Sequence, residues 1–323
     1  MRFAIVGAGA TGGFLGAHLA RVGEDVTLIA RGAHLQAMRE SGLTVVGPEG
    51  EFTAHPACTQ DLEAVREAEV VFVTLKAHQL VEMAPSVGAV LAPGATVIGA
   101  QNGIPWWYFH REGGRLDGTV VESVDPAGVI SRSIPLDQVV GCIVYTATQL
   151  EAPGVVRHVE GSRFTLGEPD GSRSDRCQAI SAALTRAGLK APISARIRPE
   201  LWLKLLGNAT LNPVSALTGT TLARMASDPE SRELISALMR EVESVAAGLG
   251  IDIQMSIEKR LDGAREVGEH KTSMLQDVEA GKPIEIEALL GAVIELGRLV
   301  EVPTPGLDVI YRLGRLLNSR LRA

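Results

Sequence analysis

The sequence is poor in cysteine, in aromatic residues and in positive charge, and each shortage excludes a class of protein. Its three cysteines stand far apart in 323 residues, at positions 58, 142 and 177, and form no C-x-x-C pair. An odd, widely spaced set is unsuited to a disulfide framework or to a thiolate zinc site, and it is typical of a reduced chain. We therefore expect a cytoplasmic protein without a metal site.

Aromatic residues make up only 4% of the chain, and the formal net charge is −7. Proteins that bind single-stranded nucleic acid stack its bases on aromatic side chains, and proteins that bind nucleic acid or acidic membranes are usually basic. We therefore expect neither nucleic acid nor a membrane as a partner. Hydrophobic residues reach 46% and charged residues 21%, which is an ordinary globular composition.

The first half of the chain alternates short apolar runs with helical segments. The runs predict buried strands of a parallel sheet at residues 3–6, 26–30, 70–75, 95–98, 119–121 and 142–146. From about residue 198 the apolar positions follow a helical spacing, with one helix beginning at Ser227-Asp228-Pro229-Glu230 and another over 284–301. We predict an α/β domain over residues 1–195 and an all-α domain over residues 196–323.

The clearest motif of the first half follows the first predicted strand directly. It is the run Gly7-Ala8-Gly9-Ala10-Thr11-Gly12, and a helical segment comes after it. In such a G-x-G-x-x-G run the glycines allow a tight turn, close approach of a pyrophosphate, and close packing of helix on strand. The run predicts a Rossmann-type dinucleotide site in which the helix N-terminus holds the phosphates. The alternative is a glycine-rich packing turn.

The end of the second predicted strand indicates which dinucleotide binds. NAD-binding domains usually place a carboxylate there for the ribose 2′-hydroxyl, but this strand ends at Arg31. A guanidinium can pair with a 2′-phosphate, which favours NADPH/NADP+, although Arg31 can also be an ordinary surface arginine. Lys76 and Asn102 follow two later strands, at the edge where open α/β sheets bind ligands. Read alone, Asn102-Gly103 is also a common turn.

A polar stripe interrupts the apolar segment 201–212 of the second half. Lys204, Asn208 and Asn212 recur at every fourth residue, so we expect them on one face of a buried helix. Burying an ammonium and two amides is costly unless they find partners, which points to a substrate site. The amides can alternatively cap neighbouring backbone. Further on, Glu285 and Glu287 taken alone are ordinary acids of a helix first turn.

Together these strings resemble the ketopantoate reductase family (2-dehydropantoate 2-reductase) over essentially the whole chain. The matching residues are Gly7-x-Gly9-x-x-Gly12, Arg31, Lys76, Gln101-Asn102-Gly103, Glu200-Leu201-Trp202-x-Lys204-Leu205-x-x-Asn208-x-x-x-Asn212-Pro213 and Ser273-Met274-Leu275-Gln276-Asp277…Gly281…Glu285-Ile286. The resemblance implies a Rossmann-type domain followed by an all-α domain. It also implies NADPH-dependent reduction of 2-dehydropantoate to (R)-pantoate, on the route to pantothenate and coenzyme A.

The resemblance further implies a role for single residues. Lys204 matches the general acid of the family. Asn102, Asn208, Asn212, Ser273 and Glu285 match its substrate-binding groups, with Asn102 also near the nicotinamide. Arg31, Lys76 and the run from Gly7 to Gly12 match its cofactor-binding groups.

Three stretches depart from what we expect of this family. They are His270-Lys271-Thr272 before Ser273, the lengths of 111–118 and 131–138, and the aromatic run Pro105-Trp106-Trp107-Tyr108. We interpret the aromatic run as a loop wall packed on the core; the alternative is that it reshapes the substrate pocket. Two other functions therefore stay open: reduction of another branched 2-keto acid, and non-catalytic sensing of a dinucleotide. The partner we expect is a small 2-keto acid, with a homodimer as the candidate assembly.

Overall fold

The structure, a computed structural model, describes residues 1–321 and separates into two compact units. Unit 1 comprises Met1–Gln101, Trp106–Val120 and Ala127–Ile197. Unit 2 comprises Asn102–Pro105, Val121–Pro126 and the chain from Arg198 onward. Two short segments of the first half of the sequence thus belong to unit 2. The domain limits predicted at residues 195 and 196 stay a prediction.

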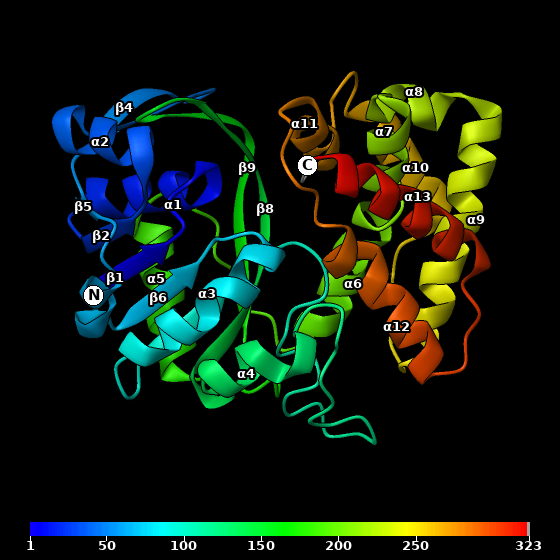
Figure 1. Cartoon of the computed structure of the whole chain (residues 1–323), viewed down its shortest axis with the longest axis horizontal. Coiled ribbons are helices and arrows are strands. Elements are labelled where there is room, and N and C mark those ends of the chain that lie inside the picture. The colour runs from blue at the N-terminus through cyan, green and yellow to red at the C-terminus, as the bar shows by residue number, and fades with distance from the viewer. Residues whose placement is uncertain (322–323) are drawn as a thin grey trace. The chain divides into compact units, whose positions relative to one another are not determined.

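Unit 1 is built on a nine-stranded sheet with the order β4-β3-β9-β8-β7-β6-β1-β2-β5 (Figure 1). The strands are β1 (Arg2–Val6), β2 (Asp25–Ile29), β3 (Leu43–Gly47), β4 (Gly50–Ala54), β5 (Ala57–Thr59), β6 (Val70–Val73), β7 (Thr96–Gly99), β8 (Val139–Ala152) and β9 (Val155–Gly167). In the part of this order that runs β8-β7-β6-β1-β2-β5, neighbouring strands pair in parallel. The pairs β3 with β4 and β8 with β9 are antiparallel.

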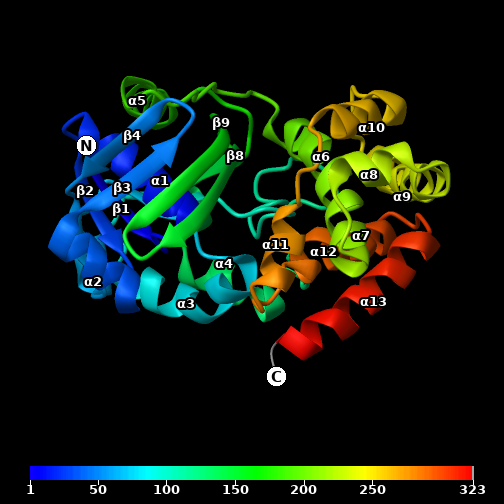
Figure 2. The same cartoon turned by 90° about the horizontal axis from the view of Figure 1, so that it is seen from above.

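The helices of unit 1 explain the apolar character of its central strands. They are α1 (Ala10–Arg21), α2 (Gly32–Ser41), α3 (Ala77–Val90), α4 (Val129–Ser133) and α5 (Asp175–Arg186), with 3₁₀ turns at Leu62–Glu67, Pro126–Gly128 and Leu136–Gln138. Every residue of β6 and β7 is buried, as expected for strands covered on both faces. Helix α1 contacts β3, β4, β8 and β9, so the antiparallel strands also cover it (Figure 2).

The predicted strands are confirmed with one exception. Residues 119–121 form no strand, and Val121 begins a segment that belongs to unit 2. There the Glu295 carboxylate accepts hydrogen bonds from the backbone N–H groups of Glu122 and Ser123, both at 2.7 Å, and from the Ser123 hydroxyl. The backbone directly after this run is therefore bound to a carboxylate instead of a neighbouring strand, which a local pattern does not reveal.

From Arg198 onward, the described part of unit 2 is built of helices and the loops between them. Its elements are α6 (Ile197–Asn208), α7 (Leu211–Thr218), α8 (Leu222–Ser227), α9 (Pro229–Gly248), α10 (Ile257–Glu266), α11 (Ser273–Glu279), a π-helical turn at Glu287–Gly291, α12 (Ala292–Leu299) and α13 (Pro305–Leu321). The predicted start of α9 is confirmed, because the Asp228 carboxylate accepts the N–H of Ser231 at 2.8 Å. Within residues 1–321, each helix is too short or too polar to span a lipid bilayer.

The aromatic run of unit 1 is part of its core. Trp106, Trp107 and Tyr108 are 5%, 1% and 1% exposed. The Trp106 ring lies against Gly99 of β7 and the Trp107 ring against Gly141 of β8, where an added Cβ would come within 2.5 and 2.7 Å of the indoles. The run is therefore a wall packed on the sheet, as we interpreted it.

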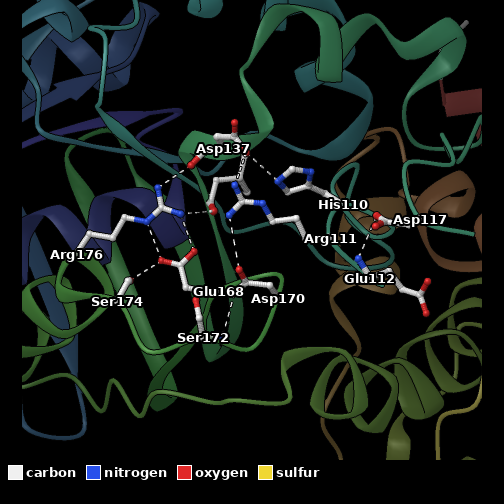
Figure 3. Close-up of polar contacts among 11 residues, drawn as sticks. His110, Arg111, Glu112, Asp117, Asp137, Glu168, Asp170, Ser172, Ser174 and Arg176 are labelled. Carbon is white, nitrogen blue, oxygen red and sulfur yellow. Dashed lines mark hydrogen bonds and ion pairs between the residues drawn. The ribbon is translucent and has the colours of Figure 1, made fainter. Parts of the chain in front are cut away.

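A cluster of charged residues holds in place the two stretches that are longer than expected, 111–118 and 131–138. The Arg111 guanidinium lies 2.9 Å from the Asp137 carboxylate and 3.6 Å from that of Asp170 (Figure 3). Arg176, in the first turn of α5, binds the buried Glu168 carboxylate through Nε and Nη2 at 2.7 and 2.6 Å. A bidentate pair of this kind holds a fixed geometry, so the cluster ties 111–118 and 131–138 to the end of β9.

Candidate functional site

The glycine-rich run forms the turn between β1 and α1, and its shape leaves no room for side chains at two positions. Gly7 has a φ of +99°, and its N–H and that of Ala8 both donate to the carbonyl of Ile29 on β2. An added Cβ at Gly12 would lie 2.4 Å from Thr74 Oγ1 and 2.7 Å from the Gly7 carbonyl. The sheet therefore requires glycine at positions 7 and 12.

Gly9 differs from these two glycines. An added Cβ there would meet only the Gly7 carbonyl, at 3.9 Å, which is ordinary contact. The protein itself therefore tolerates a side chain at this position. Gly9 is the residue before the first turn of α1, whose leading N–H groups have no acceptor within the helix. Open space directly before a helix N-terminus fits the phosphates of a dinucleotide.

Two side chains hold the carbonyl groups of this turn. The Thr74 hydroxyl, just after β6, donates to the Gly7 carbonyl at 2.7 Å. The Nε2 atom of His34, on α2, lies 2.9 Å from the Ala8 carbonyl oxygen. The sequence analysis missed both residues, because a threonine after a strand and a histidine early in a helix carry no distinctive local signal.

Arg31 and Lys76 start from the same edge of the sheet as the glycine turn, because β2 and β6 are the two parallel neighbours of β1. Arg31 is the residue before α2, is exposed, and makes no side-chain hydrogen bond or ion pair with the rest of the described chain. Lys76 is the residue before α3 and is half-buried. Gln101 supports this edge by donating through Nε2 to the carbonyls of Val73 and Leu75, at 2.8 and 3.0 Å.

In unit 2 the structure joins the predicted catalytic lysine to one of the predicted substrate-binding residues. Lys204 lies on α6, is half-buried, and donates through Nζ to Asn102 Oδ1 at 2.7 Å. The segment of Asn102 is held in turn by Ile104, whose N–H donates to the Ala288 carbonyl at 2.9 Å. At Gly103, with a φ of +91°, an added Cβ would lie 2.3 Å from that carbonyl. Asn102 is thus packed against the π-helical turn that follows Glu285.

The π-helical turn also separates the roles of Glu285 and Glu287. Glu287 accepts a hydrogen bond from the Tyr311 hydroxyl at 2.7 Å and lies 3.7 Å from Arg315, both on α13. Burial and this hydrogen bond raise the pKa of Tyr311 to about 12. Glu285 is half-buried, and its carbonyl accepts the N–H of Leu289 at 3.2 Å. Single π-helical turns are frequent at functional sites, so Glu285 remains the candidate carboxylate.

The single buried helix predicted over 201–212 is wrong at its end. Helix α6 stops at Asn208, and α7 starts at Leu211, so Asn212 is not on the helix face of Lys204. Pro213 explains the break, because it has no N–H for the carbonyl four residues earlier and its ring clashes there. Asn212 is 8% exposed. Neither Asn208 nor Asn212 makes a side-chain hydrogen bond within residues 1–321.

Ser273 is the first residue of α11 and is exposed. The Thr272 hydroxyl caps this helix by accepting the N–H of Leu275 at 3.2 Å. Helix α11 packs against α7, the helix that carries Asn212. The structure therefore brings Lys204 together with Asn102, and it places Ser273 and Asn212 on a packed pair of helices.

Comparison with known proteins gives this arrangement a family. The family model described as ketopantoate reductase PanE/ApbA matches residues 3–171, and the model of the C-terminal part of these proteins matches residues 196–318. The chain belongs to the ketopantoate reductase family. The family resemblance stated above, the α/β fold class and the helical C-terminal region are thereby confirmed.

Similar proteins cover the chain almost end to end. A 2-dehydropantoate 2-reductase of Mesorhizobium japonicum is 45% identical over 318 residues, which is 98% of each chain. A solved structure from Ralstonia solanacearum, described as a candidate ketopantoate reductase, is 42% identical with a TM-score of 0.93 and covers 98% of each chain. A solved D-mandelate dehydrogenase shares the fold over 100% of each chain, at 22% identity and a TM-score of 0.84.

Members of this family are oxidoreductases that use NADPH. The predicted enzyme class and the predicted nicotinamide cofactor are therefore confirmed at the level of the family. The roles of the individual residues, including Lys204 and Arg31, stay predictions at this point.

Proposed function

We propose that the protein reduces 2-dehydropantoate to (R)-pantoate with NADPH, and that Lys204 is the general acid. The observation that carries this proposal is the 2.7 Å hydrogen bond from Lys204 Nζ to Asn102 Oδ1, at a half-buried position of helix α6. Full-length similarity to enzymes of that name supports the choice of substrate.

The chemistry requires a proton donor beside a carbonyl oxygen. Hydride addition to a 2-keto carbon builds negative charge on that oxygen, and the bound nicotinamide supplies the hydride. An ammonium group has three N–H donors, of which Asn102 engages one. The amide thereby holds the ammonium in position, and the ammonium can hydrogen-bond the carbonyl oxygen of a bound substrate and deliver a proton to it.

The remaining polar groups are suited to hold the substrate in place. Glu285 can accept a hydrogen bond from the substrate hydroxyl, and the exposed Ser273 hydroxyl can donate to its carboxylate. Asn208 and Asn212 each offer an amide that no other described residue engages. A half-buried amide without a protein partner is costly, and a bound polar substrate offsets that cost.

The choice of NADPH over NADH is assigned to Arg31. Its exposed guanidinium stands at the start of α2, at the edge of the sheet that carries the glycine turn. A 2′-phosphate at this position would form charge-assisted hydrogen bonds with the guanidinium. Lys76, at the start of α3, adds a second positive charge at the same edge.

Two further inferences, on cellular location and on assembly, complete the proposal. We infer a cytoplasmic location, which the three free thiols support. We also infer a homodimer, because Val309, Leu313 and Leu316 form an exposed apolar stripe at helical spacing on α13, with exposed fractions of 57%, 47% and 65%. Light scattering of the purified chain, with Leu316→Glu as the variant, tests this assembly.

The decisive experiment is a substrate panel with the purified full-length protein. NADPH oxidation is followed with 2-dehydropantoate and with other 2-keto acids, both branched aliphatic and aromatic, and the product is resolved by chiral chromatography. We expect the highest kcat/KM with 2-dehydropantoate and (R)-pantoate as product. A higher kcat/KM with another acid would assign a different substrate. Tight NADPH binding with no turnover of any acid would instead indicate a sensor.

A further inference from the structure

His34 uses both of its ring nitrogens. Nε2 lies 2.9 Å from the carbonyl oxygen of Ala8, and Nδ1 lies 2.9 Å from the backbone nitrogen of Gly154. A backbone N–H can only donate, so Nδ1 is the acceptor and carries no proton. The proton is therefore on Nε2, which donates to the Ala8 carbonyl. The two contacts select one neutral tautomer of the ring.

The three segments joined in this way are distant in the sequence. Ala8 lies between Gly7 and Gly9 in the cofactor turn, and Gly154 is the buried residue in the turn of the β8–β9 hairpin, 120 residues beyond His34. The hairpin contacts α1 at a second point, where the hydroxyls of Thr148 and Thr11 are 3.3 Å apart. His34 thus connects the cofactor turn to the hairpin that covers its helix.

The direction of the Ala8 carbonyl affects how this turn can meet a pyrophosphate. It shares a planar peptide unit with the nitrogen of Gly9, so its direction sets the plane of that unit. In the structure the Ala8 carbonyl oxygen accepts a hydrogen bond from His34. Rotated toward the open space before α1, the same oxygen would present a partial negative charge to a pyrophosphate. The N–H of the same unit is engaged within the turn, because it donates to the Gly7 carbonyl at 2.6 Å. A donor on the Ala8 carbonyl therefore keeps that oxygen turned away from the ligand, which is left to meet the leading N–H groups of α1.

We propose that His34 is a positioning residue for the dinucleotide: it holds the Ala8–Gly9 peptide in the orientation that accepts the pyrophosphate and couples this orientation to the β8–β9 hairpin. The inference rests on the proposed binding of NADPH at the glycine turn. It makes cofactor affinity depend on a side chain that does not itself touch the cofactor.

A fall in pH should weaken the hold of His34 on the Ala8–Gly9 peptide and the hairpin. Burial lowers the pKa of His34 below its ordinary value of 6.5, and the hydrogen bond to the Ala8 carbonyl opposes this shift. No charged group contributes to the shift. Of the elements in contact with the ring, α2 carries Arg39 and Glu40, with Arg31 directly before it, and the turn from Gly7 to Gly9 carries no charged group. The charged or titratable residues of the hairpin nearest its turn are Glu151, Arg157, His158, Glu160 and Arg163.

The sign of the pH effect follows from the lowered pKa. The unfolded chain takes up a proton near pH 6.5, whereas the folded protein resists it until the pH falls further. The stabilising neutral form is present above pH 6.5 and is lost as the pH falls through the folded value. Protonation places a hydrogen on Nδ1 that faces the Gly154 N–H, so the contact to the hairpin breaks.

The test compares three substitutions that separate the two contacts. His34→Gln can place an amide donor near the Ala8 carbonyl, His34→Asn can place an amide oxygen near the Gly154 N–H, and His34→Ala removes both. His158→Ala is the matched control, because His158 is also half-buried and binds a hairpin carbonyl, that of Gly161, at 2.6 Å. NADPH fluorescence gives the Kd, steady-state kinetics give kcat, and thermal denaturation reports stability.

We expect His34→Ala and His34→Asn to raise the Kd for NADPH about tenfold, with kcat at saturating NADPH within about twofold of wild type. His34→Gln should restore most of the affinity, and His158→Ala should leave it unchanged. Lowering the pH should raise the Kd for NADPH by a larger factor in wild type than in His34→Gln. The titration of the 2′-phosphate is common to both proteins and cancels from this comparison.

Equal affinity of wild type and all three variants would overturn the inference, as would equal losses in His34→Gln and His34→Asn. If His34→Ala does not fold, the Gln and Asn variants still decide the question. Binding of NADPH by the wild-type protein is measured first. Failure at that step would refute the proposed function, whereas binding that is insensitive to His34 would refute only the present inference.

Discussion

In unit 1 the candidate site is made of backbone, whereas in unit 2 it is made of side chains. The turn from Gly7 to Gly12 offers N–H groups and empty space, and its shape comes from what surrounds it: the Ile29 carbonyl, the Thr74 hydroxyl and His34. In unit 2 an ammonium within α6, several amides and a carboxylate act through their own chemistry. Substitutions in unit 1 should therefore change cofactor binding, and those in unit 2 should change turnover or substrate binding.

The largest effect is expected at Lys204. Lys204→Ala removes the proton donor and should lower kcat by about 10³-fold, within the usual range for loss of a general acid. The Kd for NADPH should stay near that of wild type, because the glycine turn, Arg31 and Lys76 lie in unit 1. Lys204→Arg is the control, since it keeps a cation beside Asn102 but donates a proton poorly. A nearly normal kcat in Lys204→Ala would remove this residue from the acid role.

The next effect distinguishes the two kinds of glycine in the turn. Gly9→Ala should raise the Kd for NADPH about 100-fold with little change in Tm, because the protein leaves room for the methyl group and the pyrophosphate does not. Gly12→Ala should also destabilise the fold, by about 1–3 kcal/mol, since its Cβ would meet Thr74 and the Gly7 carbonyl. Fluorescence titration and thermal melts check both. Unchanged affinity in Gly9→Ala would place the phosphates elsewhere.

Arg31 should control the selection between the two nicotinamide cofactors. Arg31→Ala should reduce the ratio of kcat/KM for NADPH to that for NADH about 30-fold, through loss of charge-assisted hydrogen bonds to the 2′-phosphate. Arg39→Ala, on the same helix, is the matched control, because Arg39 donates to the Cys58 carbonyl at 3.0 Å. If the ratio is the same in Arg31→Ala as in wild type, another group holds the phosphate.

The smallest effect separates the two glutamates at the π-helical turn. Glu285→Ala should raise KM for the keto acid about tenfold, with a smaller change in kcat, because a hydrogen bond to the substrate is lost in ground and transition states alike. Glu287→Ala should lower Tm and leave KM unchanged, since Glu287 binds Tyr311. The reverse pattern would assign the substrate contact to Glu287.

Much of the fold was predictable because it follows from local patterns in the sequence. The buried runs that became β1, β6 and β7, the glycine turn after β1 and the capped start of α9 each depend on residues adjacent in the chain. The break before α7 was also signalled locally, by Pro213, but the regular spacing of polar residues concealed it. The antiparallel strands β3, β4 and β9 escaped prediction, since their half-exposed residues show no continuous apolar run.

The candidate site was only partly predictable for a different reason. The residue types of Lys204, Asn102 and Glu285 were evident, but their partners are determined by contacts across long separations. Asn102 meets Lys204 from 102 residues away, and Ser123, just after the predicted strand 119–121, binds Glu295, 172 residues further on. Spacing along one element does not contain such pairings.

By itself the sequence determined many of the secondary elements, the glycine turn and the chemical groups available to the reaction, because sterics and hydrogen bonding between near neighbours set these. Only the tertiary structure decided which carbonyl His34 holds, which glutamate is engaged by Tyr311, and which amide orients the Lys204 ammonium. These choices depend on packing of distant segments, where a side chain takes whichever partner the folded backbone brings within hydrogen-bonding distance.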